Sequence, residues 1–134
     1  MKIIVCMEKN KGIMFFNKRV SQDSLLREYL LNLTNGDKFY MSSYSAKQFA
    51  GLSGFIVDDE YQTTAGENDY CFIEDGGYDL DKTNEIVLCH WNRRYPADKF
   101  FNHDLKANGF KKIRSENIKG SSHDKITIET YIKK

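Results

Sequence analysis

Two short apolar runs, Ile3–Met7 and Ile86–Cys89, constrain the fold more than any other feature of this sequence. Both are rich in β-branched residues, and both are much too short to cross a lipid bilayer. Strands that are covered on both faces have this composition, and they are typical of the interior of a parallel sheet. We therefore predict buried strands over Lys2–Met7 and Glu85–Trp91.

An amphipathic helix is predicted over Gln22–Leu33. Its apolar residues recur at helical spacing and share one face: Leu25, Leu26, Tyr29, Leu30 and Leu33. Ser21 is the expected cap at the start, and Asp23 lies where the positive end of the helix dipole favours a carboxylate. Asn35 and Gly36 are a natural stop.

The remaining segments are mostly strand-like. The expected strands are Ile13–Phe16, Lys38–Met41, Gly54–Val57, Tyr70–Ile73, Lys99–Phe101, Phe110–Arg114 and Lys125–Ile132. A capping-box pattern predicts a short helix from Ser45 to near Gly51, and Asp58–Asn68 is expected to be an acidic loop. In the last strand Ile126, Ile128, Thr130 and Ile132 alternate with Thr127, Glu129 and Tyr131. The sequence predicts a single α/β domain over residues 1–134, with a mixed, largely parallel sheet and an antiparallel C-terminal hairpin.

The near-neutral charge of the chain hides a strong segregation. The formal net charge is +1, but residues 58–85 hold 10 acidic side chains and a single basic one, Lys82. Residues 1–57 hold 8 basic and 4 acidic side chains, and residues 86–134 hold 11 basic and 5 acidic ones. Such a pattern usually bears on the partners of a protein.

The three cysteines are well separated and indicate a reduced protein. Cys6, Cys71 and Cys89 each lie inside an apolar run, where a thiol acts as a small hydrophobic group. An odd count excludes a fully paired disulfide set. Because no signal-peptide pattern is present either, we expect a cytoplasmic location and no membrane partner.

The order of elements resembles the dihydrofolate reductase family along most of the chain. The resemblance is carried by an apolar first strand, a turn ending in Gly, a helix ending in Leu-Thr-x-Gly, a strand ending in Met, a strand before a Gly pair, and a Phe-Phe segment. In this chain these are Ile3–Met7, Lys9–Gly12, Leu33–Gly36, Phe39–Met41, Cys71–Ile73 with Gly76 and Gly77, and Asp98–Phe101. The closing strand Ile128–Lys134 also fits. The resemblance implies a dihydrofolate reductase-like fold.

The residues that carry the chemistry of that family are missing. The family holds its pterin with a carboxylate on the first helix, and that position aligns with Leu25 here. The Gly-Arg-x-Thr motif that binds cofactor phosphate is replaced by Ser42–Ser45. Without a buried acid, protonation of a pterin has no agent. We therefore predict a protein that has lost reductase activity, and the sequence leaves its cofactor unknown.

A small-molecule or nucleotide site is predicted at the carboxyl ends of the strands, where ligands bind in open α/β sheets. Backbone N–H groups and hydroxyls at this edge could hold a phosphate, and a glycine pair allows close approach. The ligand-binding candidates are Ser42, Ser43, Tyr44, Ser45, Gly76 and Gly77. The alternatives are a helix cap at Ser45 and a simple turn at the glycines.

Two other functions remain open. A nucleic-acid-directed protein, such as a ribonuclease, is suggested by arginines interleaved with aromatic side chains. Its candidates are His90, Trp91, Arg93, Arg94, Tyr95 and His123. A protein-interaction module, such as an immunity or inhibitor protein, would instead use the acidic stretch Asp58–Asp81. No metal site is predicted, because His90, His103 and His123 lack the spacing of a metal-binding motif.

Overall fold

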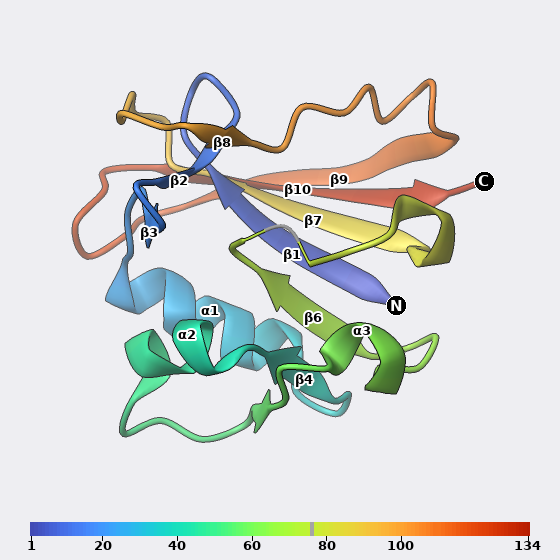
Figure 1. The fold of residues 1–134 in the computed structure, drawn as a ribbon. Coiled ribbons are helices and arrows are strands. Elements are labelled where there is room, and N and C mark those ends of the chain that lie inside the picture. Colours follow the sequence, from blue (N-terminus) through green and yellow to red (C-terminus); the bar gives the residue numbers. More distant parts are fainter. Residues whose placement is uncertain (76) are drawn as a thin grey trace.

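The computed structural model describes residues 1–75 and 77–134. Its centre is a seven-stranded sheet in the order β5-β4-β6-β1-β7-β10-β9 (Figure 1). The strands of this sheet are β1 (Lys2–Met7), β4 (Phe39–Met41), β5 (Ile56–Val57), β6 (Tyr70–Ile73), β7 (Glu85–His90), β9 (Phe110–Ile118) and β10 (Ile126–Lys133). The first five strands in the spatial order pair in parallel, and β10 and β9 add an antiparallel hairpin. The predicted mixed α/β sheet is confirmed.

Strand β1 lies at the middle of the sheet and explains the two apolar runs. It pairs in parallel with β6 on one side and with β7 on the other. Ile3 and Val5 belong to the core on one face, Ile4 belongs to the core on the opposite face, and all three are fully buried. Burial on both faces is the condition under which a strand loses its polar alternation.

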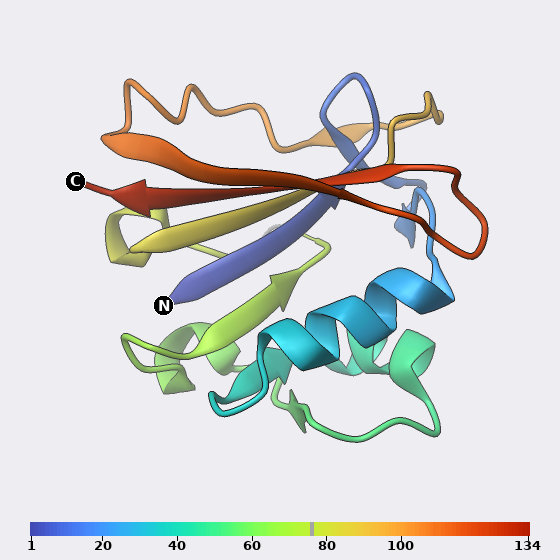
Figure 2. The same ribbon diagram turned by 180° about the vertical axis from the view of Figure 1, so that it is seen from behind.

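Helix α1 (Ser24–Leu33) covers one face of the sheet (Figure 2). Leu26 and Leu30 point into the core, whereas Leu25 is 41% exposed. The N-cap is Asp23 and not Ser21, because the Asp23 carboxylate accepts hydrogen bonds from the backbone N–H groups of Leu25 and Leu26. The predicted face was therefore correct except at Leu25.

The short helices differ from the expectation. Helix α2 (Ser43–Ala46) is capped by Ser42 and continues as the 3-10 helix η1 (Lys47–Phe49), so the predicted start at Ser45 is wrong by two residues. The segment expected to be a loop contains helix α3 (Tyr61–Thr64). A second 3-10 helix, η2 (Leu80–Lys82), precedes β7. No helix among the described residues is long and apolar enough to cross a bilayer.

A small sheet of β3 (Lys18–Arg19), β2 (Gly12–Phe15) and β8 (Lys99–Phe100) lies near the carboxyl end of β1. The turn between β1 and β2 is built on the buried Glu8, whose carboxylate accepts hydrogen bonds from the backbone N–H groups of Asn10 (2.8 Å) and Gly12 (2.6 Å). A side chain at Gly12 would lie 2.2 Å from the Cβ of Ala97. Glycine is thus required there by the close approach of the next loop.

Two leucines on the same helix test the packing of α1. We expect Leu30→Ala to lower the free energy of unfolding by about 3 kcal/mol, because it leaves a cavity in the core. Leu25→Ala removes the same atoms from a side chain that is 41% exposed, and we expect a loss below about 1 kcal/mol. Urea denaturation of both variants measures the difference, and equal losses would contradict the orientation of the helix described here.

Candidate functional site

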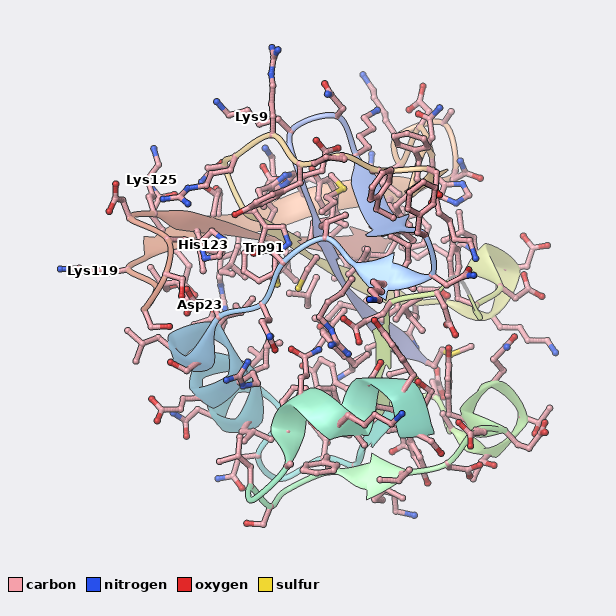
Figure 3. The ribbon with its side chains drawn as sticks, turned by 60° about the vertical axis from the view of Figure 1, so that its left-hand side comes forward. Lys9, Asp23, Trp91, Lys119, His123 and Lys125 are labelled. Atoms are coloured by element: carbon pink, nitrogen blue, oxygen red, sulfur yellow. The ribbon has the colours of Figure 1, made fainter. Side chains whose placement is uncertain are left out.

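A buried aspartate and a buried histidine join the start of α1 to the turn between β9 and β10 (Figure 3). The Oδ1 atom of Asp23 also accepts a hydrogen bond from the backbone N–H of Ser121 (2.9 Å). Its Oδ2 atom accepts from the backbone N–H of Ser122 (2.8 Å) and lies 2.9 Å from Nδ1 of His123. Together with Leu25 and Leu26, five donors therefore surround this carboxylate, which is 2% exposed.

The surroundings of Asp23 favour its charged form. Burial alone would raise its pKa, but the hydrogen bonds from His123 and from the backbone N–H groups of Ser121, Ser122 and Leu26 outweigh burial and hold the pKa well below the usual range. Since an ionised carboxylate only accepts hydrogen bonds, Nδ1 of His123 carries a proton. In the neutral imidazole, Nε2 is then an acceptor.

The Nε2 atom of His123 faces two hydroxyl groups. Ser21 Oγ lies 3.0 Å away and the Tyr95 hydroxyl 2.9 Å away, and the two hydroxyls are 3.4 Å apart. The His123 ring stacks on Trp91, with ring centroids 4.5 Å apart. We call Ser21, Asp23, Trp91, Tyr95 and His123 the histidine cluster. It brings together three of the six residues singled out as nucleic-acid candidates.

Basic side chains surround the histidine cluster on neighbouring loops. The backbone N–H of Lys9 donates to the carbonyl of Arg93 (2.9 Å), and the Asn92 side chain donates to the carbonyl of Lys125 (3.0 Å). Three loops therefore lie side by side at this end of the sheet, and Figure 3 shows Lys9, Lys119 and Lys125 around the cluster. The basic rim consists of the exposed residues Lys9, Arg93, Arg94, Lys119 and Lys125.

The remaining nucleic-acid candidate, His90, lies elsewhere. It occupies the last position of β7, and its Nε2 atom is 2.7 Å from Oε1 of Glu129 on β10. Successive residues of a strand point to opposite faces, so His90 faces away from the side on which Trp91 packs. His90 is thus separated from Trp91, Tyr95 and His123 by the sheet.

His90 lines a cleft with a volume of about 510 Å³. The cleft lies between the sheet and the segment that follows β8. Its apolar lining is Met7, Leu88, Phe101, Leu105 and Tyr131, and its polar lining is Lys11, His90, Asn102, His103, Asp104, Lys106 and Glu129. This volume and mixture of side chains are typical of small-molecule sites.

One of the two acidic groups in this cleft, Glu129, is paired within the chain. Glu129 contacts His90, Lys112 (3.0 Å) and the Tyr131 hydroxyl (3.2 Å). Burial opposes its ionisation, yet Lys112 and His90 lower the pKa of Glu129 overall. The alternation of the last strand predicted that Glu129 and Tyr131 share a face. Their proximity to His90 depends on the pairing of β10 with β7, which no local pattern encodes.

The predicted phosphate loop is filled by contacts within the chain. Ser42 caps α2, Ser43 binds Asp59 through its N–H (2.8 Å) and its hydroxyl (2.6 Å), and the Ser45 hydroxyl donates to Glu74 (2.8 Å). Tyr44 lies under the guanidinium of Arg19 at 4.5 Å.

The same guanidinium forms two hydrogen bonds with Glu74, at 2.8 and 3.0 Å. Gly77 is so close to the Tyr61 hydroxyl that a Cβ atom would lie 2.6 Å from it, and Gly76 lies outside the described residues. Phosphate binding at this loop stays a prediction.

Metal chemistry finds no support in residues 1–75 and 77–134. Within these ranges no three His, Cys, Asp or Glu side chains gather in an arrangement that could hold an ion.

The charged form of Asp23 makes stability depend on pH. Because folding lowers the pKa of Asp23, its contribution is complete above the unfolded value of about 4 and is lost as the pH falls below it. We expect the free energy of unfolding to drop on acidification, and Asp23→Asn to be less stable at neutral pH with a flatter profile. Asp124→Asn, on the exposed side of the same turn, is the control and should follow the wild type in urea titrations.

Comparison with known proteins agrees with this architecture. No protein-family model matches the chain, and no curated protein matches it in sequence. Among solved structures it is similar to a dihydrofolate reductase from Enterococcus faecalis complexed with NADP(H) and RAB-propyl, with a TM-score of 0.65 and 11% identity. The match covers 98% of this chain and 94% of that one. At this identity the likeness concerns the fold, and we conclude that the chain has a dihydrofolate reductase-like fold.

Proposed function

We propose that this protein binds a small organic anion in the cleft lined by His90, and that it has no reductase activity. The observation that carries the proposal is the cleft itself, because it combines an apolar lining with positive charge in about 510 Å³. Lys11 and Lys106 contribute the fixed positive charges. A ligand with a flat apolar part and an acidic group, such as a nucleotide, has the matching chemistry.

The charges in the cleft favour an anion. The negative charge of Glu129 is compensated by Lys112. Asp104 uses its carboxylate to accept a hydrogen bond from the backbone N–H of Ala107 (3.0 Å). The cleft and its immediate surroundings thus hold three lysines, Lys11, Lys106 and Lys112, against the two carboxylates, so positive charge prevails.

The proposed loss of reductase activity rests on the first helix. The position that aligns with the family's catalytic carboxylate is occupied by Leu25, which is 41% exposed. The nearby carboxylate of Asp23 is buried and accepts five hydrogen bonds from other groups of the protein, so it has no free lone pair directed at a ligand. Arg19 and Glu74 occupy the space beside the second helix. Neither arrangement offers a proton to a pterin.

A ligand screen tests the proposed cleft. We expect NADPH, folate or AMP to raise the melting temperature of the wild type. Lys11→Ala combined with Lys106→Ala should weaken the binding of the best of these probes about tenfold or more in calorimetry, since charge-assisted contacts are lost. Lys47→Ala, an exposed lysine on η1 and distant from the cleft lining, is the control.

The outcomes of this screen separate the two sites. If Ser45→Ala weakens binding and the double lysine variant does not, the ligand lies over the predicted phosphate loop and the cleft proposal is wrong. No response to any of the three probes would contradict binding of this ligand class at either place.

A second candidate function is nucleic-acid binding on the basic rim. The observation in its favour is that the loops of Lys9, Arg93 and Lys125 lie side by side. Trp91 is 3% exposed beneath His123, so it cannot stack on a base. Recognition would therefore depend on phosphate contacts, which are sensitive to salt. The acidic stretch Asp58–Asp81 as a surface for a protein partner remains a prediction.

Binding to single-stranded RNA tests the basic rim. We expect an affinity that falls steeply between about 50 and 200 mM salt, and a further loss for Arg93→Ala combined with Arg94→Ala. Fluorescence anisotropy with a labelled oligonucleotide measures both. Lys38→Ala removes one exposed charge away from the rim and should have no effect. Salt-independent binding, or indifference to the arginine variants, would contradict this function.

A further inference from the structure

We propose that Ser21, His123 and Asp23 form a nucleophile, base and positioning group that cleave activated esters. The line of contacts runs from Ser21 Oγ to Nε2 of His123 (3.0 Å) and from Nδ1 of His123 to Oδ2 of Asp23 (2.9 Å). These are the atoms and distances by which a histidine accepts the proton of a serine while a carboxylate holds its other nitrogen.

The protonation states suit the reaction. Asp23 is held ionised by its five donors, so the proton of the imidazole resides on Nδ1. The single lone pair of Nε2 then accepts from either the Ser21 or the Tyr95 hydroxyl. When Nε2 takes the serine proton, the imidazolium forms against the buried carboxylate that stabilises it. Trp91 stacks on the ring and fixes its plane.

Ser21 is the better nucleophile of the two hydroxyls on Nε2. It follows β3 in a partly exposed loop, and a cavity of about 10 Å³ lies beside it, lined also by Arg19 and Trp91. A space of this size holds about one water molecule, so an ester has to reach Ser21 from the solvent side of its loop. In the resting arrangement the Tyr95 hydroxyl accepts from Ser21 Oγ (3.4 Å) and faces Nε2 of His123 (2.9 Å). Once Nε2 holds the serine proton, the Tyr95 O–H is free to donate a hydrogen bond to an oxyanion that forms next to the serine.

The reaction is a transfer of the acyl group to Ser21. Its Oγ forms a bond to the ester carbonyl carbon, its proton passes to Nε2 of His123, and the bond to the leaving alcohol breaks as that alcohol takes up the proton. Water then attacks the acyl-serine, with His123 again accepting the proton, and releases the acid. Because the basic rim surrounds the histidine cluster, the preferred esters carry an acidic group.

Covalent labelling tests the nucleophile. A fluorophosphonate probe should form a bond to Ser21 with loss of fluoride, and the adduct should be found on the peptide that contains Ser21 by mass spectrometry. Ser21→Ala should keep the melting temperature of the wild type but form no adduct. Ser115→Ala, on the exposed strand β9, should label like the wild type. Absence of an adduct at Ser21 would overturn the proposal.

Three measurements distinguish catalysis from a structural role. His123→Gln, with folding checked by circular dichroism, should label at least tenfold more slowly. Tyr95→Phe retains the pair of His123 and Asp23 and should also label more slowly, which provides a variant if His123→Gln does not fold. In the wild type, labelling should slow on acidification within the folded range, because a protonated imidazole cannot accept the serine proton. Labelling that is independent of pH and of both variants would overturn the role of His123.

Turnover tests the substrate class. The protein should hydrolyse p-nitrophenyl acetate, and it should hydrolyse the p-nitrophenyl ester of succinate with a higher kcat/KM at low salt than at high salt. Equal values for both esters at every salt concentration would overturn the preference for acidic esters. None of these measurements involves the His90 cleft, so failure of one proposal leaves the other standing.

Discussion

The buried charge of Asp23 is the interaction on which the arrangement of this chain depends. It caps the first helix and at the same time holds the turn of the C-terminal hairpin, whose residues lie about a hundred positions later in the sequence. A cap alone is worth about 1 kcal/mol, but a buried carboxylate that loses its donors costs considerably more. Because the same carboxylate orients His123, its role in stability and its proposed role in chemistry cannot be separated by a single substitution at Asp23.

The fold converts the charge pattern of the sequence into two surfaces. In Figure 1 helices α3 and η2 lie on the same side of the molecule, and acidic residues directly precede or belong to them: Asp58, Asp59, Glu60, Asp79 and Asp81. The turn between β9 and β10 meets the loops after β1 and β7 at the carboxyl end of those strands, which collects the basic rim. Anionic ligands are therefore attracted to one end of the sheet, whether they bind in the cleft or near the histidine cluster.

Sequence patterns predicted the strands and helices whose positions depend on their own residues. The bounds of β1 and β6 matched the predicted strands because their apolar runs are buried along most or all of their length. Strand β9 continues to Ile118, four residues past the predicted end at Arg114, because pairing with β10 extends it while its exposed side chains give no hydrophobic signal. The capping-box pattern predicts Ser45 as the cap of the second helix. Instead, the Ser45 hydroxyl donates to Glu74, and Ser42 caps helix α2.

The candidate sites were harder to predict because their members meet only through the fold. The sequence identifies His123 only as a nucleic-acid candidate, yet the side chains on its ring nitrogens are Asp23, Ser21 and Tyr95, all distant in the sequence. His90 and Trp91 were grouped because they are adjacent in the chain, although a strand directs neighbouring side chains to opposite faces.

The same alternation separates the two proposed sites physically. His90 belongs to the cleft and Trp91 to the histidine cluster, with the backbone of β7 between them. A ligand in the cleft contacts no atom of Ser21, His123 or Asp23. Substitutions in sites without shared partners are expected to act additively. Measured coupling between cleft and cluster would therefore indicate that β7 itself shifts when a ligand binds, since it is the element that both sites share.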